Sequence, residues 1–255
     1  MNTLKTELND EELSRYSRQI LLSEIDYAGQ LKLAQSHAVI FGLGGLGSPA
    51  SLYLASAGVG RLTLVDFDEV DDSNLQRQVI HREANIGQPK VLSAKENLLA
   101  LNHHIQIDTV SEKLDEQTLE ALIKTADIVL DCTDNFESRF ALNRGCFKHQ
   151  KPLVSGAAIR WEGQLTTYDF RQNDSPCYQC LYKEGQGQDL TCSQNGVVAP
   201  MVGMVGSMQA MEAIKALIGL PTLVGKLMIM DGVTMQIRSL KLSKDPSCKT
   251  CQSLA

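Results

Sequence analysis

The stretch HAVIFGLGGLGSPASLYLASAGVGRLTLVDFDEV, residues 37–70, decides the fold of this chain. Residues 38–41 are a short apolar run, which predicts a buried strand, and a glycine-rich turn follows them. An alanine- and serine-rich segment then predicts a helix, and residues 62–65 predict a second strand that ends at Asp66. Strand, turn, helix and strand form a βαβ unit, in which the two strands are parallel.

The glycine turn has the spacing of a phosphate-binding turn. Gly42-x-Gly44-x-x-Gly47 follows the first strand and opens the helix, so that backbone N–H groups and the helix N-terminus face a phosphate. Asp66 comes 19 residues after Gly47, at the end of the next strand, where a carboxylate accepts the ribose hydroxyls. Taken alone, this pattern indicates a dinucleotide such as NAD. The alternative is a turn that serves only close packing of helix on strand.

The rest of the chain extends this unit into a larger sheet. Helices are predicted at residues 90–101 and 116–124, and strands at 105–110 and 127–135, the latter running into a polar turn. Such alternation is typical of an α/β fold with a doubly wound, Rossmann-like, mainly parallel sheet. Beyond residue 151 the pattern changes. Residues 152–170 and 227–242 predict two strand pairs, an antiparallel C-terminal extension, with a buried helix at 201–217 between them.

The whole chain is expected to form a single domain, residues 1–255, in three parts. An N-terminal helical arm covers residues 1–36, with a helix at 10–35 that Asp10 or Ser14 caps, and it serves for docking or dimer formation. A nucleotide-binding part covers 37–150, and an antiparallel, zinc-bearing part covers 151–255.

Composition excludes several classes of protein. A chain of 255 residues that is 43% hydrophobic can bury a sizeable core. A net charge of −6 without any long lysine or arginine cluster argues against a nucleic-acid partner. No apolar run has membrane-spanning length and the N-terminus is not a secretory signal, so we expect no membrane contact and a cytoplasmic location. Cysteines there stay reduced.

Two cysteine pairs predict a structural metal site. Cys177-x-x-Cys180 and Cys248-x-x-Cys251 together offer the four thiolates of a closed tetrahedral Zn²⁺ site, which would tie the end of the chain to its middle. The alternatives are four free buried cysteines or a redox dithiol, but two such pairs in one chain favour metal.

Residues beyond Asp66 move the prediction from a dinucleotide to ATP. The run Ser73-Asn74-Leu75-Gln76-Arg77-Gln78 and Lys90 add two cations and amides beside the ribose site. A nicotinamide half would not need these cations, whereas a triphosphate under attack gains from prearranged positive charge. Asp134 and Asn135 end a strand, and Asp134 is the candidate Mg²⁺ ligand. Each residue alone could be a solvated side chain or a helix cap.

These motifs, in this order, resemble the HesA/MoeB/ThiF family of sulfur-carrier adenylyltransferases, bacterial relatives of the ubiquitin-activating enzymes. The resemblance rests on RYSRQI, GLGGLGSPAS, LASAGVG, SNLQRQ, IGQPK, DCTDN, CYQCL, TCSQNGVVAP and the final Cys-x-x-Cys, and it covers nearly the whole chain. SGAAIRWEGQL is closer to the molybdopterin-synthase branch, whereas RYSRQILL and DGVTMQIRSL lean toward the thiamine branch.

The resemblance implies ATP-dependent adenylation of the C-terminal glycine of a small ubiquitin-like sulfur carrier ending in Gly-Gly, such as the small subunit of molybdopterin synthase or, alternatively, the thiamine sulfur carrier. The carboxylate attacks the α-phosphate and pyrophosphate leaves with Mg²⁺. No general base is needed because the nucleophile is already ionised, and the five histidines form no catalytic arrangement in the sequence. A homodimer and a separate sulfur-donor protein are further implied.

Residue roles follow from the same resemblance. It implies that Arg18 enters the ATP site of the partner subunit, although Arg18 could instead pair with Glu12 or Glu24 on its own helix. Cys192 is the candidate accessory thiol that links to the carrier, or else a spectator. The implied catalytic residues are Arg18, Arg77, Lys90 and Asp134. The implied nucleotide-binding residues are Gly45, Asp66, Ser73, Asn74, Leu75, Gln76, Arg77, Lys90, Asp134 and Asn135.

Two functions from other classes stay open at this point. An NAD-linked oxidoreductase would keep the glycine turn and Asp66 but would have no use for Arg77 and Lys90. A zinc-held scaffold that only binds a ubiquitin-like partner would consume no ATP. Exchange of pyrophosphate with ATP separates both from an adenylyltransferase.

Overall fold

The βαβ unit predicted from residues 37–70 is the centre of the structure. The computed structural model describes residues 5–185 and 195–252. Strand β1 (His37–Phe41) leads through the glycine turn into helix α3 (Gly47–Ser56), which returns to β2 (Arg61–Val65). The two strands pair in parallel, with His37 opposite Arg61 and Phe41 opposite Val65. The two strands begin within one residue of the positions predicted for them, and the helix predicted between them is present.

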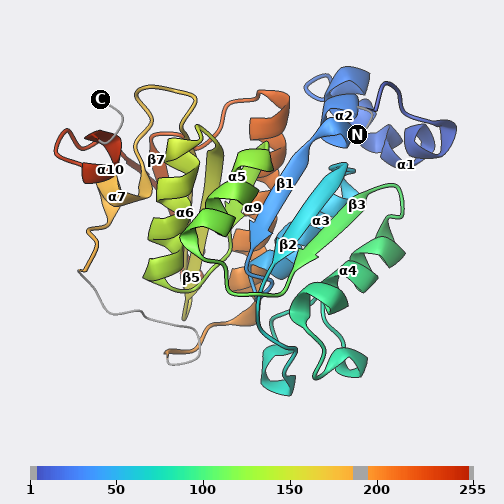
Figure 1. Ribbon diagram of the computed structural model, residues 1–255, viewed down its shortest axis with the longest axis horizontal. Helices are drawn as coiled ribbons and strands as arrows, with labels where there is room; N and C mark the ends of the chain where they lie inside the picture. The colour runs from blue at the N-terminus through green and yellow to red at the C-terminus, as the bar shows by residue number, and fades with distance from the viewer. Residues whose placement is uncertain (1–4, 186–194, 253–255) are drawn as a thin grey trace.

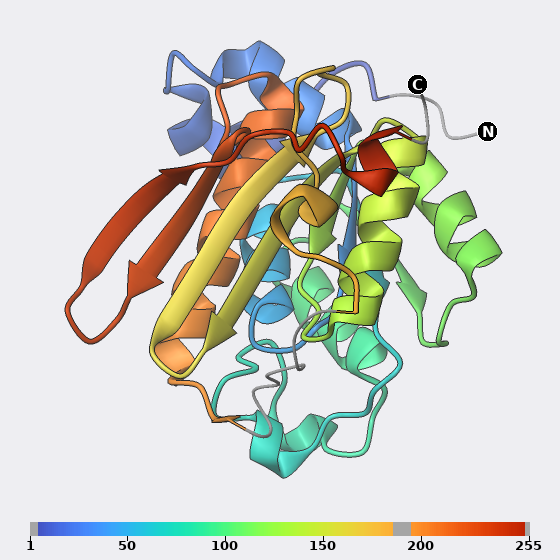
Figure 2. The ribbon, with the colours of Figure 1, turned by 90° about the vertical axis from the view of Figure 1, so that its left-hand side faces the viewer.

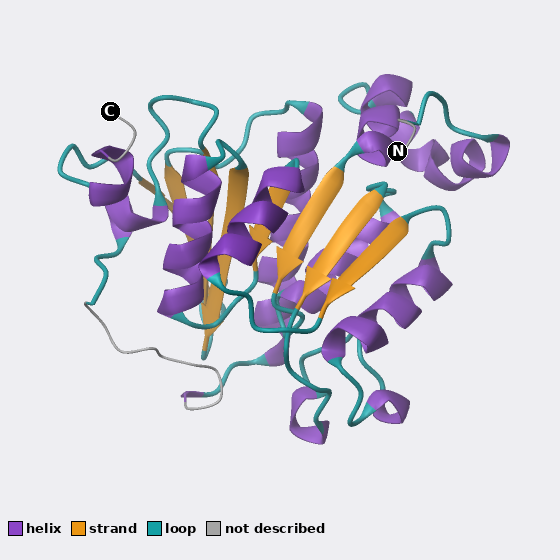
Figure 3. Cartoon of the chain, in the orientation of Figure 1, coloured by secondary structure: helices purple, strands orange, loops and turns teal. Residues whose placement is uncertain are grey.

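One sheet of eight strands runs through the chain, in the order β3-β2-β1-β4-β5-β6-β7-β8 (Figures 1 and 3). The first five strands in this order pair in parallel, and the last three are added antiparallel. This confirms a doubly wound sheet with an antiparallel extension. The remaining strands are β3 (Gln106–Val110), β4 (Ile128–Asp131), β5 (Pro152–Ile159), β6 (Glu162–Asp169), β7 (Lys226–Asp231) and β8 (Gln236–Lys241).

Helices cover both faces of the sheet, and each layer buries one apolar cluster. One cluster packs α3, α4 and α9 on the sheet, and the other packs α5, α6 and the cysteine-bearing segments. In Figure 1, α5 and α6 lie in front of the sheet and α9 lies behind it. The further elements are the short turns η1 (Asp72–Asn74) and η2 (Glu83–Asn85) and the helices α4 (Lys90–Leu101), α5 (Glu116–Thr125), α6 (Phe136–Lys148), α7 (Tyr178–Leu181), α9 (Ala199–Ile218) and α10 (Lys249–Gln252).

The N-terminal arm differs from its prediction. Residues 10–35 form two helices, α1 (Asp10–Ile20) and α2 (Asp26–Gln35), instead of one. Asp26 has a positive φ of 49°, a left-handed conformation that interrupts a regular helix. The cap of α1 is neither Asp10 nor Ser14 but Asn9, whose side chain accepts from the Glu12 N–H while the Glu12 carboxylate accepts from the Asn9 N–H.

Helix α9 is the apolar helix predicted between the strand pairs. By length and composition it could cross a membrane, but here it packs on β5, β6 and α3, and 56% of its apolar window is buried. Gly206 on α9 faces the start of α3, where a Cβ would lie 2.2 Å from the Leu46 carbonyl oxygen. The close packing of α9 on the glycine turn therefore requires glycine at this position.

The antiparallel extension ends in an open edge. Strands β7 and β8 reach past the body of the molecule at the left of Figure 2. All six residues of β8 are exposed, including the apolar side chains of Ile237 and Leu240.

We predict opposite effects for two alanine substitutions on α9. Gly206→Ala should lower the free energy of unfolding by about 1–3 kcal/mol, because the new Cβ overlaps the α3 backbone. Gly203→Ala is the matched control: a Cβ there meets no atom within 4 Å, so the better helix propensity should raise stability by up to about 1 kcal/mol. Urea unfolding of both variants measures the difference, and a Gly206→Ala variant as stable as the control would contradict the assigned packing.

Candidate active site

A cavity lies at the carboxyl ends of β1, β2 and β4. It has a volume of about 530 Å³ and is lined by the glycine turn, by the loops that follow β2 and β4, and by the start of α4. The strand order reverses between β1 and β4, since the chain continues from β1 to β2 on one side and from β4 to β5 on the other. Ligands of doubly wound sheets bind at such a switch point.

The glycine turn approaches neighbouring backbone so closely that side chains cannot fit. Gly42 has a φ of +87°, and a Cβ on it would lie 2.7 Å from the Cys132 carbonyl oxygen. A Cβ on Gly47 would lie 1.9 Å from the Gly42 carbonyl oxygen. Gly45 lines the cavity and also packs on Val202 of α9. No side chain caps the start of α3, where the Ser48 N–H donates to the Gly44 carbonyl oxygen and Pro49 has no N–H. The N–H groups that an anion in the cavity can reach therefore belong to the turn residues that line it, Gly44, Gly45 and Leu46.

Asp66 joins the end of β2 to this turn. One carboxylate oxygen accepts the Leu43 N–H at 2.7 Å, and the other accepts the Asp68 N–H at 2.9 Å. Burial raises the pKa of Asp66, while the nearby Lys90 and these N–H groups oppose the rise. Asp66 lines the cavity, as expected for a ribose ligand, and it also positions the glycine turn.

The two predicted cations lie on the same side of the cavity. The Lys90 ammonium donates to the Asp68 carboxylate at 2.8 Å, and its side chain is 5% exposed while that of Asp68 is 55% exposed. Arg77 donates from Nη1 to the Ser73 carbonyl oxygen at 3.2 Å. Arg77, Lys90 and Asn74 all line the cavity, so their charge and hydrogen-bonding capacity face one ligand volume.

The loop after β4 closes the opposite side. Buried Asp131 accepts from the Thr133 hydroxyl at 2.7 Å and from the Ser155 hydroxyl at 2.8 Å, which fixes the start of the loop. Asp134 is exposed at the cavity, and oxygen donors of this kind suit Mg²⁺. Asn135 also lines the cavity, but its side chain accepts from the Ser138 N–H at 2.8 Å and so caps α6.

Two further polar residues of the cavity were not singled out from the sequence. Gln78 is 4% exposed, and no hydrogen-bond partner is found for its Oε1 within the described part of the chain. Arg139 donates from Nη2 to the Thr133 carbonyl oxygen at 2.8 Å and lies 4.0 Å from Asp131. The position of Gln78 at the end of the SNLQRQ run was the available signal. Arg139, on a helix, offered none.

Several predicted residues do not line the cavity. Three residues of the SNLQRQ run are outside the cavity lining: Ser73, Leu75 and Gln76. The Ser73 hydroxyl donates to the Asp71 carboxylate instead. Arg18 is exposed on α1, outside the cavity lining of its own chain. Glu12, which the alternative reading paired with Arg18, forms an ion pair with Lys5. Cys192 lies outside the described residues.

The buried histidines near the sheet are fully engaged. His81 binds the Ser93 hydroxyl at 2.8 Å and the Leu43 carbonyl oxygen at 3.1 Å, and burial lowers its pKa to about 4. His37 contacts the Thr63 hydroxyl at 2.7 Å, and burial also lowers its pKa. Burial thus favours the neutral form of both rings, and both nitrogens of each ring are bound to protein groups, which gives the two histidines a structural role.

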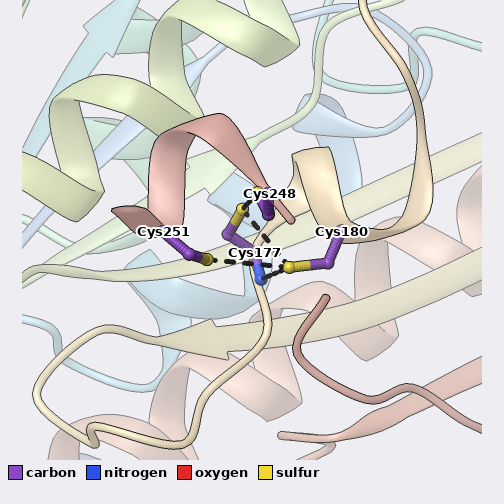
Figure 4. Close-up of side chains that lie close together, drawn as sticks. All are labelled: Cys177, Cys180, Cys248 and Cys251. Atoms are coloured by element: carbon purple, nitrogen blue, oxygen red, sulfur yellow. Dashed lines mark hydrogen bonds between the residues drawn. The ribbon is translucent and has the colours of Figure 1, made fainter. Parts of the chain in front are cut away.

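The four predicted zinc ligands, Cys177, Cys180, Cys248 and Cys251, lie together (Figure 4). Their Sγ atoms are 3.5 Å apart between Cys177 and Cys248, 3.6 Å between Cys180 and Cys251, and 3.8 Å between Cys177 and Cys180. A tetrahedron with Zn–S bonds of about 2.3 Å has edges of about 3.8 Å, so the cluster fits zinc.

The surroundings of the cluster also favour a cation. The hydrogen bond between Cys177 and Cys180, together with burial, raises the pKa of the Cys177 thiol, while the same hydrogen bond lowers the pKa of Cys180. All four sulfurs can therefore be thiolates together only beside a positive partner. The N–H groups of Cys177 and Asp245 each donate to the Cys180 sulfur at 3.4 Å, an arrangement that orients a ligating thiolate.

Comparison with known proteins gives one consistent result. The sequence pattern described as the ThiF family matches residues 16–250. The chain belongs to the ThiF family. Molybdopterin-synthase adenylyltransferase of Escherichia coli K12 is 52% identical over 246 residues, which covers 96% of this chain and 98% of that protein. The enzyme of the same name from Haemophilus influenzae Rd is also 52% identical, over 92% of this chain and 97% of that protein.

A solved structure supports the fold of this ThiF-family chain. The crystal structure of E. coli MccB superposes with a TM-score of 0.83 at 24% identity, and the match covers 94% of this chain and 73% of that one. At this identity the likeness shows the α/β fold alone.

Each Cys-x-x-Cys pair, Cys177 with Cys180 and Cys248 with Cys251, is called a knuckle below. Loss of one knuckle cysteine should release zinc and lower stability. We predict one Zn²⁺ per chain in freshly purified protein, and less than half of it in Cys177→Ser or Cys248→Ser, with a lower melting temperature because metal binding contributes to the free energy of folding. Cys146→Ser is the matched control, a buried cysteine outside the cluster. Metal analysis checks the result, and zinc-free wild-type protein would contradict the assignment.

Proposed function

We propose that this chain catalyses the ATP-dependent adenylation of the C-terminal glycine carboxylate of a small ubiquitin-like sulfur carrier with a Gly-Gly end, the small subunit of molybdopterin synthase, in molybdenum cofactor biosynthesis. The observation that carries the proposal is the identity of 52% to a molybdopterin-synthase adenylyltransferase along almost the full length of both chains. The cavity supports it, because it joins a phosphate-binding turn, a ribose carboxylate and two cations.

The nucleophile in this reaction needs no activation. A C-terminal carboxylate has a pKa of about 3.5 and is ionised at neutral pH, so no base has to remove a proton. Its oxygen attacks the α-phosphate of ATP, a bond forms to phosphorus, and the bond to the bridging oxygen of pyrophosphate breaks. Positioning and charge stabilisation then account for catalysis.

Different residues of the cavity bind the phosphates, bind the ribose and stabilise the leaving group. The N–H groups of the glycine turn, that of Gly45 among them, bind phosphate oxygens, and Asp66 accepts the ribose hydroxyls. Arg77 and Lys90 stabilise the negative charge that grows on the leaving pyrophosphate, with Asn74 as a neutral donor. Lys90 is already held in place by Asp68, so little reorganisation is required when the nucleotide binds.

A magnesium ion would be held by Asp134. The carboxylate is exposed on the cavity wall opposite Lys90, and the Asp131 network fixes the loop that carries it. When bound, the ion supplies further neutralisation of the phosphate charge.

The proposal includes a homodimer in which Arg18 of one protomer reaches the ATP site of the other. Arg18 is exposed in the last turn of α1, a helix whose described residues belong to neither apolar cluster of the sheet. A residue that completes a site across an interface requires the dimer for activity. None of the six described cysteines is in a disulfide, which favours a reducing compartment, in line with a cytoplasmic location. A different protein is proposed to supply the sulfur.

Removal of either cation should abolish most activity. Arg77→Ala and Lys90→Ala are expected to lower carrier-dependent ATP–pyrophosphate exchange by about a hundredfold or more, because each removes a charge that stabilises the transition state. Arg82→Ala is the control, since Arg82 pairs with Asn97 outside the cavity lining. Exchange is measured with radiolabelled pyrophosphate, with the intact carrier and with a carrier that lacks its last glycine.

The same assay separates the competing functions. Exchange at the wild-type rate in both variants, or exchange that does not depend on the carrier, would refute the proposed site. A scaffold binds the carrier without any exchange, and an NAD-linked oxidoreductase shows neither exchange nor a carrier requirement.

Mixing two inactive variants tests the shared site. Arg18→Ala and Lys90→Ala homodimers should each be inactive, and subunit exchange between them should restore up to about a quarter of the activity per site, because half of the protomers enter hybrids and each hybrid has one intact site. Native mass spectrometry demonstrates the subunit exchange. If hybrids form but stay inactive, Arg18 acts in its own protomer or outside catalysis.

A further inference from the structure

A second cluster of metal-ligating side chains lies far from the cysteine knuckles. Glu11 on α1 meets His103 and His104 in the turn between α4 and β3. Figure 1 shows α1 and the knuckle helices α7 and α10 at opposite ends of the molecule. We propose that Glu11, His103 and His104 bind a second divalent transition-metal ion, Zn²⁺, Ni²⁺ or Cu²⁺. This ion would link the N-terminal arm to the turn before β3 in the nucleotide-binding part of the chain.

The donor atoms have the right identity and spacing. The Glu11 Oε2 lies 3.9 Å from the His103 Nε2 and 3.7 Å from the His104 Nε2, and all three donors lie within 4.8 Å of one another. Ligands at about 2.1 Å from a tetrahedral zinc are about 3.4 Å apart, so small side-chain movements complete the site. Two imidazoles and one carboxylate are a set that zinc, nickel and copper prefer to magnesium or calcium.

The backbone around the cluster is held in place without the ion. Arg15 donates to the Leu101 carbonyl oxygen at 3.0 Å and lies four residues after Glu11, on the same face of α1. Fully buried Asn102 donates to the Tyr16 hydroxyl at 2.8 Å and to the Ala55 carbonyl oxygen at 2.7 Å, and it accepts from the His104 N–H at 3.2 Å. Helix and turn therefore present their ligands to each other before any metal binds.

The cluster has one fixed ligand and two accessible ones. The His104 side chain is 9% exposed, whereas those of His103 and Glu11 are 68% and 77% exposed. An ion can therefore enter from solvent and still be anchored at the protein surface by His104. Three protein ligands leave a position for water, in contrast to the closed set of four cysteines.

Pinning the arm has a consequence for the proposed reaction, and this step rests on the proposed function. Arg18 follows Glu11 by seven residues on α1, about two helical turns. An ion that fixes the start of α1 to the turn before β3 restricts where Arg18 can reach. The site would thus control how the arm is offered to a second protomer.

The test measures metal binding directly and does not depend on enzyme activity. Untagged protein that already carries its knuckle zinc is dialysed at neutral pH against micromolar free Zn²⁺, and bound metal is counted. We expect two ions per chain in the wild type and one in His103→Ala, His104→Ala and Glu11→Gln. His149→Ala is the matched control: His149 lies 3.8 Å from Glu120, a pair that no second histidine joins within the described ranges, and this variant should bind two.

Stability and amide exchange provide the second readout. Added zinc should raise the melting temperature of the wild type and of His149→Ala by several degrees, and should slow amide hydrogen exchange in α1 severalfold, since a ligand that binds only the folded state stabilises it. The three cluster variants should show neither change. Because His103 is largely exposed, His103→Ala should fold normally, which its melting temperature without added zinc verifies.

Two results would overturn the proposal. If the wild type binds only the knuckle zinc, the three side chains are near neighbours that bind no metal, and the proposal is wrong. If a second ion binds but persists in His103→Ala and Glu11→Gln, it occupies another place. Pyrophosphate exchange is a separate measurement. If the wild type lacks exchange but binds two ions per chain, the proposed function is wrong and the metal site stands.

Discussion

The close approach of the turn between β1 and α3 to the backbone around it is the constraint on which the cavity at this edge of the sheet depends. Gly42 and Gly47 lie in this turn and Gly206 lies on α9, and none of the three has room for a side chain. Leu43, inside the turn, is held from both sides: its N–H donates to Asp66 and its carbonyl oxygen accepts from His81. A turn held in this way presents its N–H groups in one geometry, so an anion is met by dipoles that need not rearrange.

The opposite wall depends on one buried carboxylate, that of Asp131. It organises Thr133 and Ser155 and lies beside Arg139, whose guanidinium also holds the backbone of the loop that presents Asp134. Helix α6, which carries Arg139, also carries Asn143, and Asn143 accepts the N–H of Tyr178 between the first two knuckle cysteines. The cysteine cluster is therefore attached to the helix that bears part of the cavity wall, although the two sites are separate.

Sequence patterns predicted most of the fold and part of the cavity, for identifiable reasons. The βαβ unit, the bounds of α4 and the strand pairs follow from local periodicity and glycine positions, and the carboxyl ends of parallel strands must meet, which brings Asp66 and Asp134 to one edge. The break between α1 and α2 depends on one left-handed residue, Asp26. Ser73, Leu75 and Gln76 were included because they are contiguous with Arg77, but a tight turn directs only some side chains of a run inward. Gln78 had a sequence signal, its place at the end of the SNLQRQ run, whereas Arg139 is recognisable only from tertiary contacts.

The open edge at β8 bears on how copies of this protein behave toward each other. An uncovered strand offers unpaired N–H and C=O groups to any strand that can lie beside it, and exposed Ile237 and Leu240 make such pairing more favourable. Arg238 and Lys241 on the same strand put positive charge along that edge. Two identical edges would bring like charges together, so self-association into extended sheets is disfavoured at low salt, and this protection weakens as ionic strength rises.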